Sequence, residues 1–270
     1  MDRTIVITGA SSGVGLAAAE QLAAQGDNLV VVGRNPERLA EAVRRVRNAG
    51  QGREPGQLRA DFESFDQVRS LADRLLTAYP KIDVLANNAG GIISEYRRTK
   101  DGFEATVQGN HLSPFLLTHL LRERLAGGRV INTASEAHRQ GPPDPRDFTG
   151  DPKTYKAFRA YGGTKSANIL FTSEAHRRWP EVFSLAFHPG VVRSNFGDTK
   201  AMRLFYRYAP FLTTPEKAGA LLAWLATAPE TDLVAGGYYV GHDVKQPKPH
   251  AADAALAAEL WDASAAAVGL

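Results

Sequence analysis

Cysteine is absent from the 270-residue sequence. Its absence excludes disulfides, zinc sites and iron–sulfur clusters with cysteine ligands, and a thiol nucleophile. An excess of charge of one sign is also missing, because 32 lysines and arginines are set against 29 aspartates and glutamates. This near balance gives no reason to expect a nucleic-acid partner. The 7 histidines include no H-x-x-x-H pair, so the sequence predicts no metal site.

Long apolar runs are missing as well. No stretch reaches the roughly 18 consecutive apolar residues of a membrane-spanning helix. The opening residues Met1–Thr4 lead directly into Ile5–Ile7, which is far shorter than the apolar region of a signal peptide. We therefore expect a cytoplasmic protein without a membrane partner.

Short apolar runs alternate with segments of helical periodicity along the chain. Asn35, Ser64 and Thr214 each precede such a segment and are residue types that start helices. Alternating strands and helices favour βαβ units, and they predict a doubly wound, mostly parallel sheet of about seven strands with helices on both faces. The clearest strands are predicted at Thr4–Thr8, Leu29–Val32, Ile82–Ala86, Arg129–Thr133, Val182–Phe187 and Tyr238–Val240.

We expect a single domain over residues 1–270. A loop rich in proline and aspartate is predicted at 141–154, and a C-terminal helix at about 252–267. Residues 194–214 are rich in aromatic residues and lack clear periodicity, which is typical of a functional loop, and we predict an active-site loop there. The alternative for this segment is a helix that packs its aromatic side chains into the core.

A glycine-rich turn follows the first predicted strand and precedes a helix. In the segment Thr8–Gly15, the residues Gly9, Gly13 and Gly15 let the backbone approach a pyrophosphate. The helix N-terminus adds free N–H groups and partial positive charge. The spacing Gly-x-x-x-Gly-x-Gly differs from the G-x-G-x-x-G fingerprint. The turn alone therefore does not identify a dinucleotide site, and other residues must support that assignment.

The same turn also matches G-x-S-x-G, the nucleophile elbow of α/β-hydrolases, with Ser11 as the nucleophile. Asp198 and His242 are available downstream to complete a triad. Two features weigh against this serine hydrolase. The elbow lies on the first strand, before any segment that could supply the oxyanion loop, and Gly15 has no role in an elbow.

The end of the second predicted strand carries Gly33, Arg34 and Asn35. NAD sites generally place an acidic residue near this point to accept a hydrogen bond from the ribose 2′-hydroxyl. Arg34 could instead pair with a 2′-phosphate. This favours NADP(H) over NAD(H), and the alternative is a solvated arginine at the start of a helix.

Several motifs follow one another along the chain. They are Thr8-Gly9-x-x-x-Gly13-x-Gly15, Asn87-Asn88-Ala89-Gly90, Asn110-His111-Leu112, Ser135, Tyr161-x-x-x-Lys165 and His188-Pro189-Gly190. Their order resembles that in the short-chain dehydrogenases/reductases, and the resemblance spans essentially the whole chain. Within that family the sequence is most similar to the retinol-dehydrogenase-like branch. The resemblance implies a Rossmann-like fold.

Reduction of a carbonyl needs a proton donor and stabilisation of developing negative charge. Tyr161 and Lys165 are four residues apart and would share one helix face, where an ammonium favours the phenolate. The resemblance implies that Tyr161 is the acid/base, Ser135 the hydrogen-bond donor and Asn110 the anchor of a water in a proton relay. It gives Lys165 a second task, holding the nicotinamide ribose.

Tyr96 and Lys100 have the same spacing as this pair. They lie in a charged run without a serine-bearing strand before it. We expect a solvated surface segment there.

The resemblance also implies the cofactor contacts. A structural role for Asn87 and Asn88 is an open alternative to direct contact. The implied contacts are Gly9, Ser11, Ser12, Gly13, Val14, Gly15, Arg34, Asn35, Asp61, Phe62, Asn87, Ala89, Gly90, Tyr161, Lys165, Pro189, Gly190, Val192 and Ser194.

The sequence thus predicts an NADP(H)-dependent oxidoreductase that interconverts a carbonyl and an alcohol. The aromatic residues of 194–214 favour a lipophilic ketone or aldehyde as the small-molecule substrate. The alternatives are a serine hydrolase that uses Ser11 and a catalytically silent NADP-binding regulatory protein. The loop at 141–154 could cover surface that shorter relatives use for assembly, so a monomer or a homodimer is compatible with the sequence.

Overall fold

The strand order of the sheet reverses between β1 and β4, the point at which open α/β folds bind ligands. The computed structural model describes residues 3–192, 204 and 212–270. Over these residues the sheet order is β3-β2-β1-β4-β5-β6-β7-β8, and only β7 and β8 are antiparallel. The strands are β1 (Thr4–Thr8), β2 (Asn28–Gly33), β3 (Gly56–Arg59), β4 (Val84–Asn87), β5 (Arg129–Thr133), β6 (Phe183–His188), β7 (Tyr238–Val240) and β8 (Asp243–Val244).

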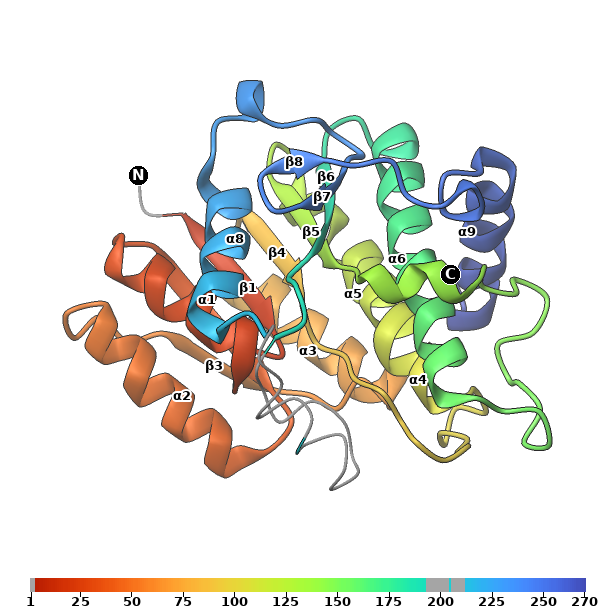
Figure 1. Cartoon of the computed structure of the whole chain (residues 1–270). Helices are drawn as coiled ribbons and strands as arrows, with labels where there is room; N and C mark the ends of the chain where they lie inside the picture. The colour runs from red at the N-terminus through yellow and green to blue at the C-terminus, as the bar shows by residue number, and fades with distance from the viewer. Residues whose placement is uncertain (1–2, 193–203, 205–211) are drawn as a thin grey trace.

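Helices cover both faces of this sheet (Figure 1). One face carries α1 (Gly13–Ala24), α2 (Pro36–Ala49) and α8 (Pro215–Thr227). The other face carries α3 (Phe65–Ala78), α5 (Ser113–Leu120) and α6 (Ala157–Arg178), with α9 (Ala254–Val268) packed outside α5 and α6. Shorter elements are α4 (Ala105–Val107), the π-helical turn η1 (Gln108–Leu112) and the 3₁₀ turns η2 (Arg122–Leu125), η3 (Glu136–Gln140), η4 (Glu230–Asp232) and η5 (Pro249–Ala251).

Successive residues of β1 show why the strands are apolar throughout. Ile5 and Ile7 are fully buried against the α1 and α8 face, while Val6 is fully buried in the core on the α3 and α6 face. Side chains alternate across a strand, so a central strand covered on both faces has no solvent side. The predicted doubly wound, mostly parallel sheet is confirmed.

The helix starts follow the predicted capping residues. Asn35 accepts a hydrogen bond from the Arg38 N–H at 2.9 Å, and Ser64 and Thr214 likewise cap α3 and α8. Each cap satisfies an N–H group that the helix itself leaves without a partner. The C-terminal helix is confirmed as α9, which begins after Asp253.

Two expectations differ from the structure or lie outside it. The eighth strand, β8, was not predicted, because it has two exposed residues and no apolar pattern. Most of the predicted active-site loop at 194–214 lies outside the described residues, as does Ser194. Among the residues that are described, none forms a helix long and apolar enough to cross a membrane.

A cluster of aromatic and histidine rings joins α5, α6 and α9. His119 lies 4.6 Å from Trp179 and 4.9 Å from Trp261, measured between ring centroids. Burial lowers the pKa of His119 to about 4 and that of the fully buried His111 to about 4. Both rings are therefore neutral in the folded protein at pH 5, whereas they would be protonated in the unfolded chain.

This difference predicts a loss of stability as the pH falls from about 6.5 towards 4. His119→Phe keeps an aromatic ring but cannot take up a proton. When the pH is lowered from 7 to 5, the free energy of unfolding should fall by about 2 kcal/mol less for His119→Phe than for the wild type. Urea unfolding at the two pH values measures this, and the exposed His176→Gln serves as the control. Equal losses in His119→Phe and the wild type would contradict the prediction.

Candidate active site

A cavity of about 1480 Å³ lies along the carboxyl ends of the parallel strands. Its walls come from the turn after β1, the ends of β2, β4, β5 and β6, and one face of α6. It therefore occupies the place where the strand order reverses. The cavity is larger than a typical drug-sized pocket of roughly 300–1,000 Å³, so it has room for a dinucleotide and a second molecule.

The glycine turn forms one end of the cavity. A side chain on Gly9 would bring its Cβ within 2.8 Å of the Ala89 Cα, and Gly9 and Gly13 both have positive φ angles. A Cβ on Gly15 would meet the Asn88 side-chain nitrogen at 2.5 Å, so Gly15 allows α1 to pack closely on the strands. These glycines let the turn and α1 lie close to the end of β4. Their contact with a pyrophosphate stays a prediction.

The first turn of α1 faces this end of the cavity. Ser12 precedes the helix and makes no side-chain cap, and Gly13 and Val14 line the cavity. N–H groups at a helix N-terminus attract anions. The free N–H groups of this turn could hold the pyrophosphate of a dinucleotide.

Tyr161 and Lys165 lie one turn apart on α6, and both are buried. The Lys165 Nζ donates a hydrogen bond to the Thr133 carbonyl oxygen at 2.9 Å, and it lies 5.3 Å from the centre of the Tyr161 ring. Burial lowers the pKa of Lys165 to about 8. Its ammonium form is therefore the main form at neutral pH, even though it is almost completely removed from water.

Ser135 follows β5 and lines the same part of the cavity. Its Oγ accepts a hydrogen bond from the Ala137 N–H at 3.1 Å. Because the oxygen serves as an acceptor, the Ser135 hydroxyl hydrogen can donate to another oxygen in the cavity.

Asn110 lies in the π-helical turn η1 and connects two walls of the cavity. Its Oδ1 accepts a hydrogen bond from the Gly91 N–H at 2.9 Å, and its Nδ2 donates to the Gly91 carbonyl at 2.9 Å and to the Thr164 Oγ1 at 3.2 Å. π-Helical turns occur frequently at functional sites. The contact with Thr164 joins the segment after β4 to α6, beside Lys165. The water relay that the family resemblance implies stays a prediction.

The structure brings most of the predicted site residues to this one cavity. They come from eight separate segments of the chain, which only the fold unites. The predicted residues that line it are Gly9, Ser11, Ser12, Gly13, Val14, Arg34, Asn35, Asp61, Phe62, Ala89, Gly90, Asn110, Ser135, Tyr161, Lys165, Pro189, Gly190 and Val192.

Asn87 does not line the cavity. Its side chain is buried and donates hydrogen bonds to the Thr118 Oγ1 and the Asn132 Oδ1, both at 2.9 Å. Its neighbour Asn88 lines the cavity instead and donates to the Thr8 carbonyl at 3.0 Å. The structure therefore gives Asn87 the structural role that the sequence left open. Gly15 also lies behind the cavity wall.

Segment 96–100 was expected to be solvated surface, and this expectation is partly wrong. Tyr96 and Arg97 line the cavity, although half of the Arg97 side chain is exposed. The Tyr96 hydroxyl donates to the Thr149 carbonyl at 3.0 Å. Lys100 pairs with Asp66 on the surface, so Tyr96 and Lys100 do not repeat the arrangement of Tyr161 and Lys165.

Sequence reasoning also missed the residues around the mouth of the cavity near Ser135. His188 lines it, and burial lowers the pKa of this histidine. The His188 Nδ1 accepts a hydrogen bond from the Glu136 N–H at 3.4 Å, which leaves the ring hydrogen on Nε2. The only signal in the sequence was the position of His188 directly before Pro189 and Gly190.

The geometry described so far is that of a dinucleotide site beside a serine, tyrosine and lysine set, and the family comparison agrees. The family model for short chain dehydrogenases matches residues 3–202. The chain belongs to the short-chain dehydrogenase/reductase family, and it is an oxidoreductase.

Individual relatives are similar to most of this chain. A protein of Streptomyces sp. (strain C5), which carries the proposed name daunorubicin C-13 ketoreductase DnrU, is 51% identical over 99% of this chain and 93% of its own length. Human retinol dehydrogenase 13 is 34% identical over 99% of this chain and 85% of its own length. A short chain dehydrogenase from Escherichia coli CFT073, solved in complex with NADPH, is 26% identical, with a TM-score of 0.70 over 88% of this chain and 95% of that one.

The buried ammonium of Lys165 predicts a measurable effect of pH on stability. Below about pH 8 both the folded and the unfolded chain carry this charge, so the folded state bears the full cost of burying it. Between pH 8 and 10.5 the folded state loses the proton first, and the cost falls. From pH 7 to pH 10 the wild type should therefore gain about 2 kcal/mol of unfolding free energy relative to Lys165→Met.

Urea unfolding of both proteins at pH 7 and pH 10 tests this. Lys156→Met removes an exposed lysine just before α6 and should follow the wild type. A difference between wild type and Lys165→Met that stays constant with pH would show that Lys165 is not held in the buried ammonium form.

Proposed function

We propose that this protein reduces a ketone or aldehyde to an alcohol with NADPH, and catalyses the reverse reaction with NADP. The observation that carries the proposal is the convergence of Ser135, Tyr161 and the buried Lys165 on the cavity that the glycine turn closes at its other end. The ketoreductase name of the Streptomyces relative and the NADPH complex of the Escherichia coli relative support it.

The cavity fits a dinucleotide. A side chain on Gly9 would strike Ala89, and one on Gly90 would come within 2.9 Å of the Asn110 Oδ1, so both positions leave room next to bare backbone. Arg34 lines the outer end with 60% of its side chain exposed. It is therefore accessible to a 2′-phosphate, and we assign it that role. The glycine turn would hold the pyrophosphate, and Lys165 the nicotinamide ribose.

The bound cofactor supplies the hydride for the carbonyl carbon. Tyr161 then gives its hydroxyl proton to the carbonyl oxygen, since the Lys165 ammonium at its ring favours the phenolate that remains. Ser135 donates a hydrogen bond to the same oxygen, which stabilises the negative charge that develops there. In the reverse direction, the Tyr161 phenolate accepts the proton of the alcohol.

The walls near Tyr161 support a substrate with an apolar body. Ile92 and Ala137 pack against Tyr161 in one buried cluster. The Phe158 ring lies 6.4 Å from the Tyr161 ring between centroids, and half of Phe158 is exposed. We propose that these side chains bind the lipophilic part of the substrate. His188 and Glu136 add polar groups to the lining of the same cavity.

The serine hydrolase has less support from the geometry. Ser11 packs against the end of β2. A Cβ atom added to Gly33 would lie 3.0 Å from the Cβ of Ser11. The His242 ring meets Trp224 edge to face, with ring centroids 4.5 Å apart, and His242 does not line the cavity that contains Ser11. Asp198 lies outside the described residues.

Tyr161→Phe should reduce the rate of ketone reduction about 10²–10⁴-fold, because it removes only the proton donor. NADPH affinity, measured by the change in nucleotide fluorescence, should stay within about twofold. Tyr155→Phe is the matched control, because Tyr155 does not line the cavity and its hydroxyl bonds to the Thr106 Oγ1 and the Ile93 carbonyl. Full activity in Tyr161→Phe would refute the assignment. Labelling of Ser11 by a fluorophosphonate, with no NADPH binding, would favour the hydrolase instead.

Arg34→Asp should shift the cofactor preference from NADPH towards NADH. The change removes a cation from the outer end of the cavity and adds a carboxylate that can accept a hydrogen bond from a 2′-hydroxyl. The ratio of the two dissociation constants measures the shift, and we expect it to change by at least about tenfold, which corresponds to 1.4 kcal/mol. An unchanged ratio would exclude Arg34 from 2′-phosphate binding.

A further inference from the structure

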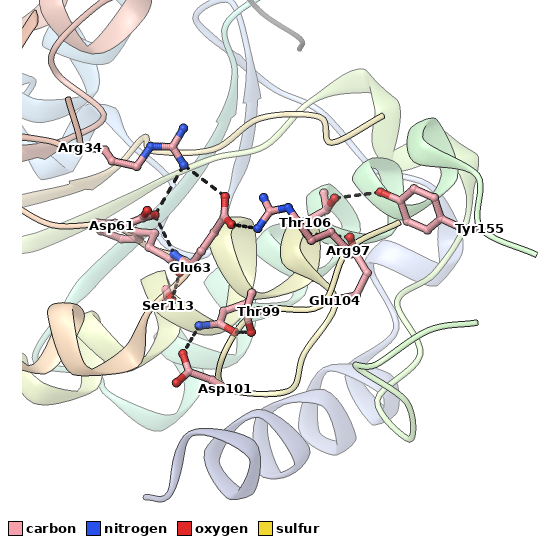
Figure 2. A network of polar contacts seen from close by, with 12 residues as sticks. Arg34, Asp61, Glu63, Arg97, Thr99, Asp101, Glu104, Thr106, Ser113 and Tyr155 are labelled. Carbon is pink, nitrogen blue, oxygen red and sulfur yellow. Dashed lines mark hydrogen bonds and ion pairs between the residues drawn. The ribbon is translucent and has the colours of Figure 1, made fainter. Parts of the chain in front are cut away.

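Glu63 lies between two arginines at the outer end of the cavity (Figure 2). Its Oε1 is 3.2 Å from the Arg34 NH1, and its Oε2 forms an ion pair with the Arg97 NH1. Asp61 also lies 3.6 Å from the same Arg34 nitrogen. Two carboxylates therefore surround the one arginine to which we assign the 2′-phosphate.

Arg34 and Arg97 reach Glu63 from different sides. Arg34 follows β2, whereas Arg97 belongs to the segment of residues 91–104 between β4 and α4, here named the β4 strap. The strap is fixed independently of the Arg97 side chain. The Arg97 carbonyl accepts a hydrogen bond from the Ala105 N–H at 3.0 Å, and Asn110 holds Gly91 at the other end.

Glu63 itself is held in position by the backbone. Its N–H donates to the Asp61 Oδ1 at 3.1 Å, and only 18% of its side chain is exposed. Most of the Glu63 side chain is therefore withdrawn from water, which screens the carboxylate charge only weakly. Neighbouring cations must balance this charge.

The distances show why this charge matters. A phosphate oxygen that bonds to the Arg34 NH1 would lie about 2.8 Å from that nitrogen, and so no farther than about 6 Å from the Glu63 Oε1. At that separation two negative charges repel each other appreciably in a partly desolvated site. Without Arg97, the Glu63 carboxylate would repel the phosphate. It would also compete with the phosphate for the Arg34 guanidinium.

We propose that Arg97 is a specificity-determining residue, which favours NADP(H) over NAD(H) by neutralising Glu63 and thereby leaving Arg34 to the 2′-phosphate. The inference rests on the proposed use of NADP(H). It assigns to the β4 strap a part in cofactor selection, although Arg97 itself need not touch the cofactor.

A purely structural role explains the ion pair less well. Half of Arg97 is exposed, and pairs of this kind contribute roughly 0–1 kcal/mol to stability. The strap keeps its backbone hydrogen bonds when the side chain is shortened. The main effect of removing Arg97 is therefore on the charge of the cavity.

The test measures dissociation constants of NADPH and NADH for the full chain by nucleotide fluorescence, at low and at high salt. Arg97→Gln should weaken NADPH binding about tenfold and leave NADH binding within about twofold. The loss should shrink at high salt, because it comes from charge. The double variant Glu63→Gln/Arg97→Gln should recover NADPH affinity to within about threefold of the wild type. Arg98→Gln, whose side chain bonds to the Tyr96 hydroxyl and does not line the cavity, is the control.

Three other outcomes would each contradict one step of the proposal. If Arg97→Gln keeps the wild-type ratio of NADPH to NADH affinity, or weakens both equally, Arg97 does not select the cofactor. If the double variant stays as weak as Arg97→Gln, Arg97 does not act through Glu63. If the wild type itself does not prefer NADPH, the proposed cofactor is wrong, and the inference about Arg97 is overturned with it.

Discussion

The rest of the site depends on one hydrogen bond, from the buried Lys165 ammonium to the Thr133 carbonyl at the end of β5. A charged group removed from water is tolerated only where fixed dipoles replace the water, and this carbonyl is one of them. The same contact sets α6 against the end of β5. Tyr161, one turn earlier on the helix, and Ser135, two residues beyond Thr133, line the same cavity.

Close backbone approach is the second constraint. Gly9 and Gly15 let the turn after β1 and helix α1 lie directly against Ala89 and Asn88 at the end of β4. Larger residues at either glycine would push the turn away and close the space for a phosphate. The parallel sheet brings the ends of distant strands to one edge (Figure 1). The cavity lies along this edge.

The sequence predicted what depends on local spacing. The spacing of four positions from Tyr161 to Lys165 puts both on one helix face, and the capping residue Asn35 marked the start of α2. It could not predict contacts between distant segments. Glu63 and Arg97 lie 34 residues apart, and only the path of the β4 strap brings them together. Nor could it decide which way Asn87 points at a strand end, because its polar partners belong to two other elements.

The proposed reaction transfers a hydride from NADPH to a carbonyl carbon in the cavity. The most direct measurement uses NADPH that carries deuterium at both C4 positions of the nicotinamide, together with a ketone that the protein reduces, and mass spectrometry of the alcohol formed. Hydride transfer should leave one deuterium on the carbinol carbon in every turnover. An alcohol that contains no deuterium, or oxidation of NADPH without any alcohol, would contradict it.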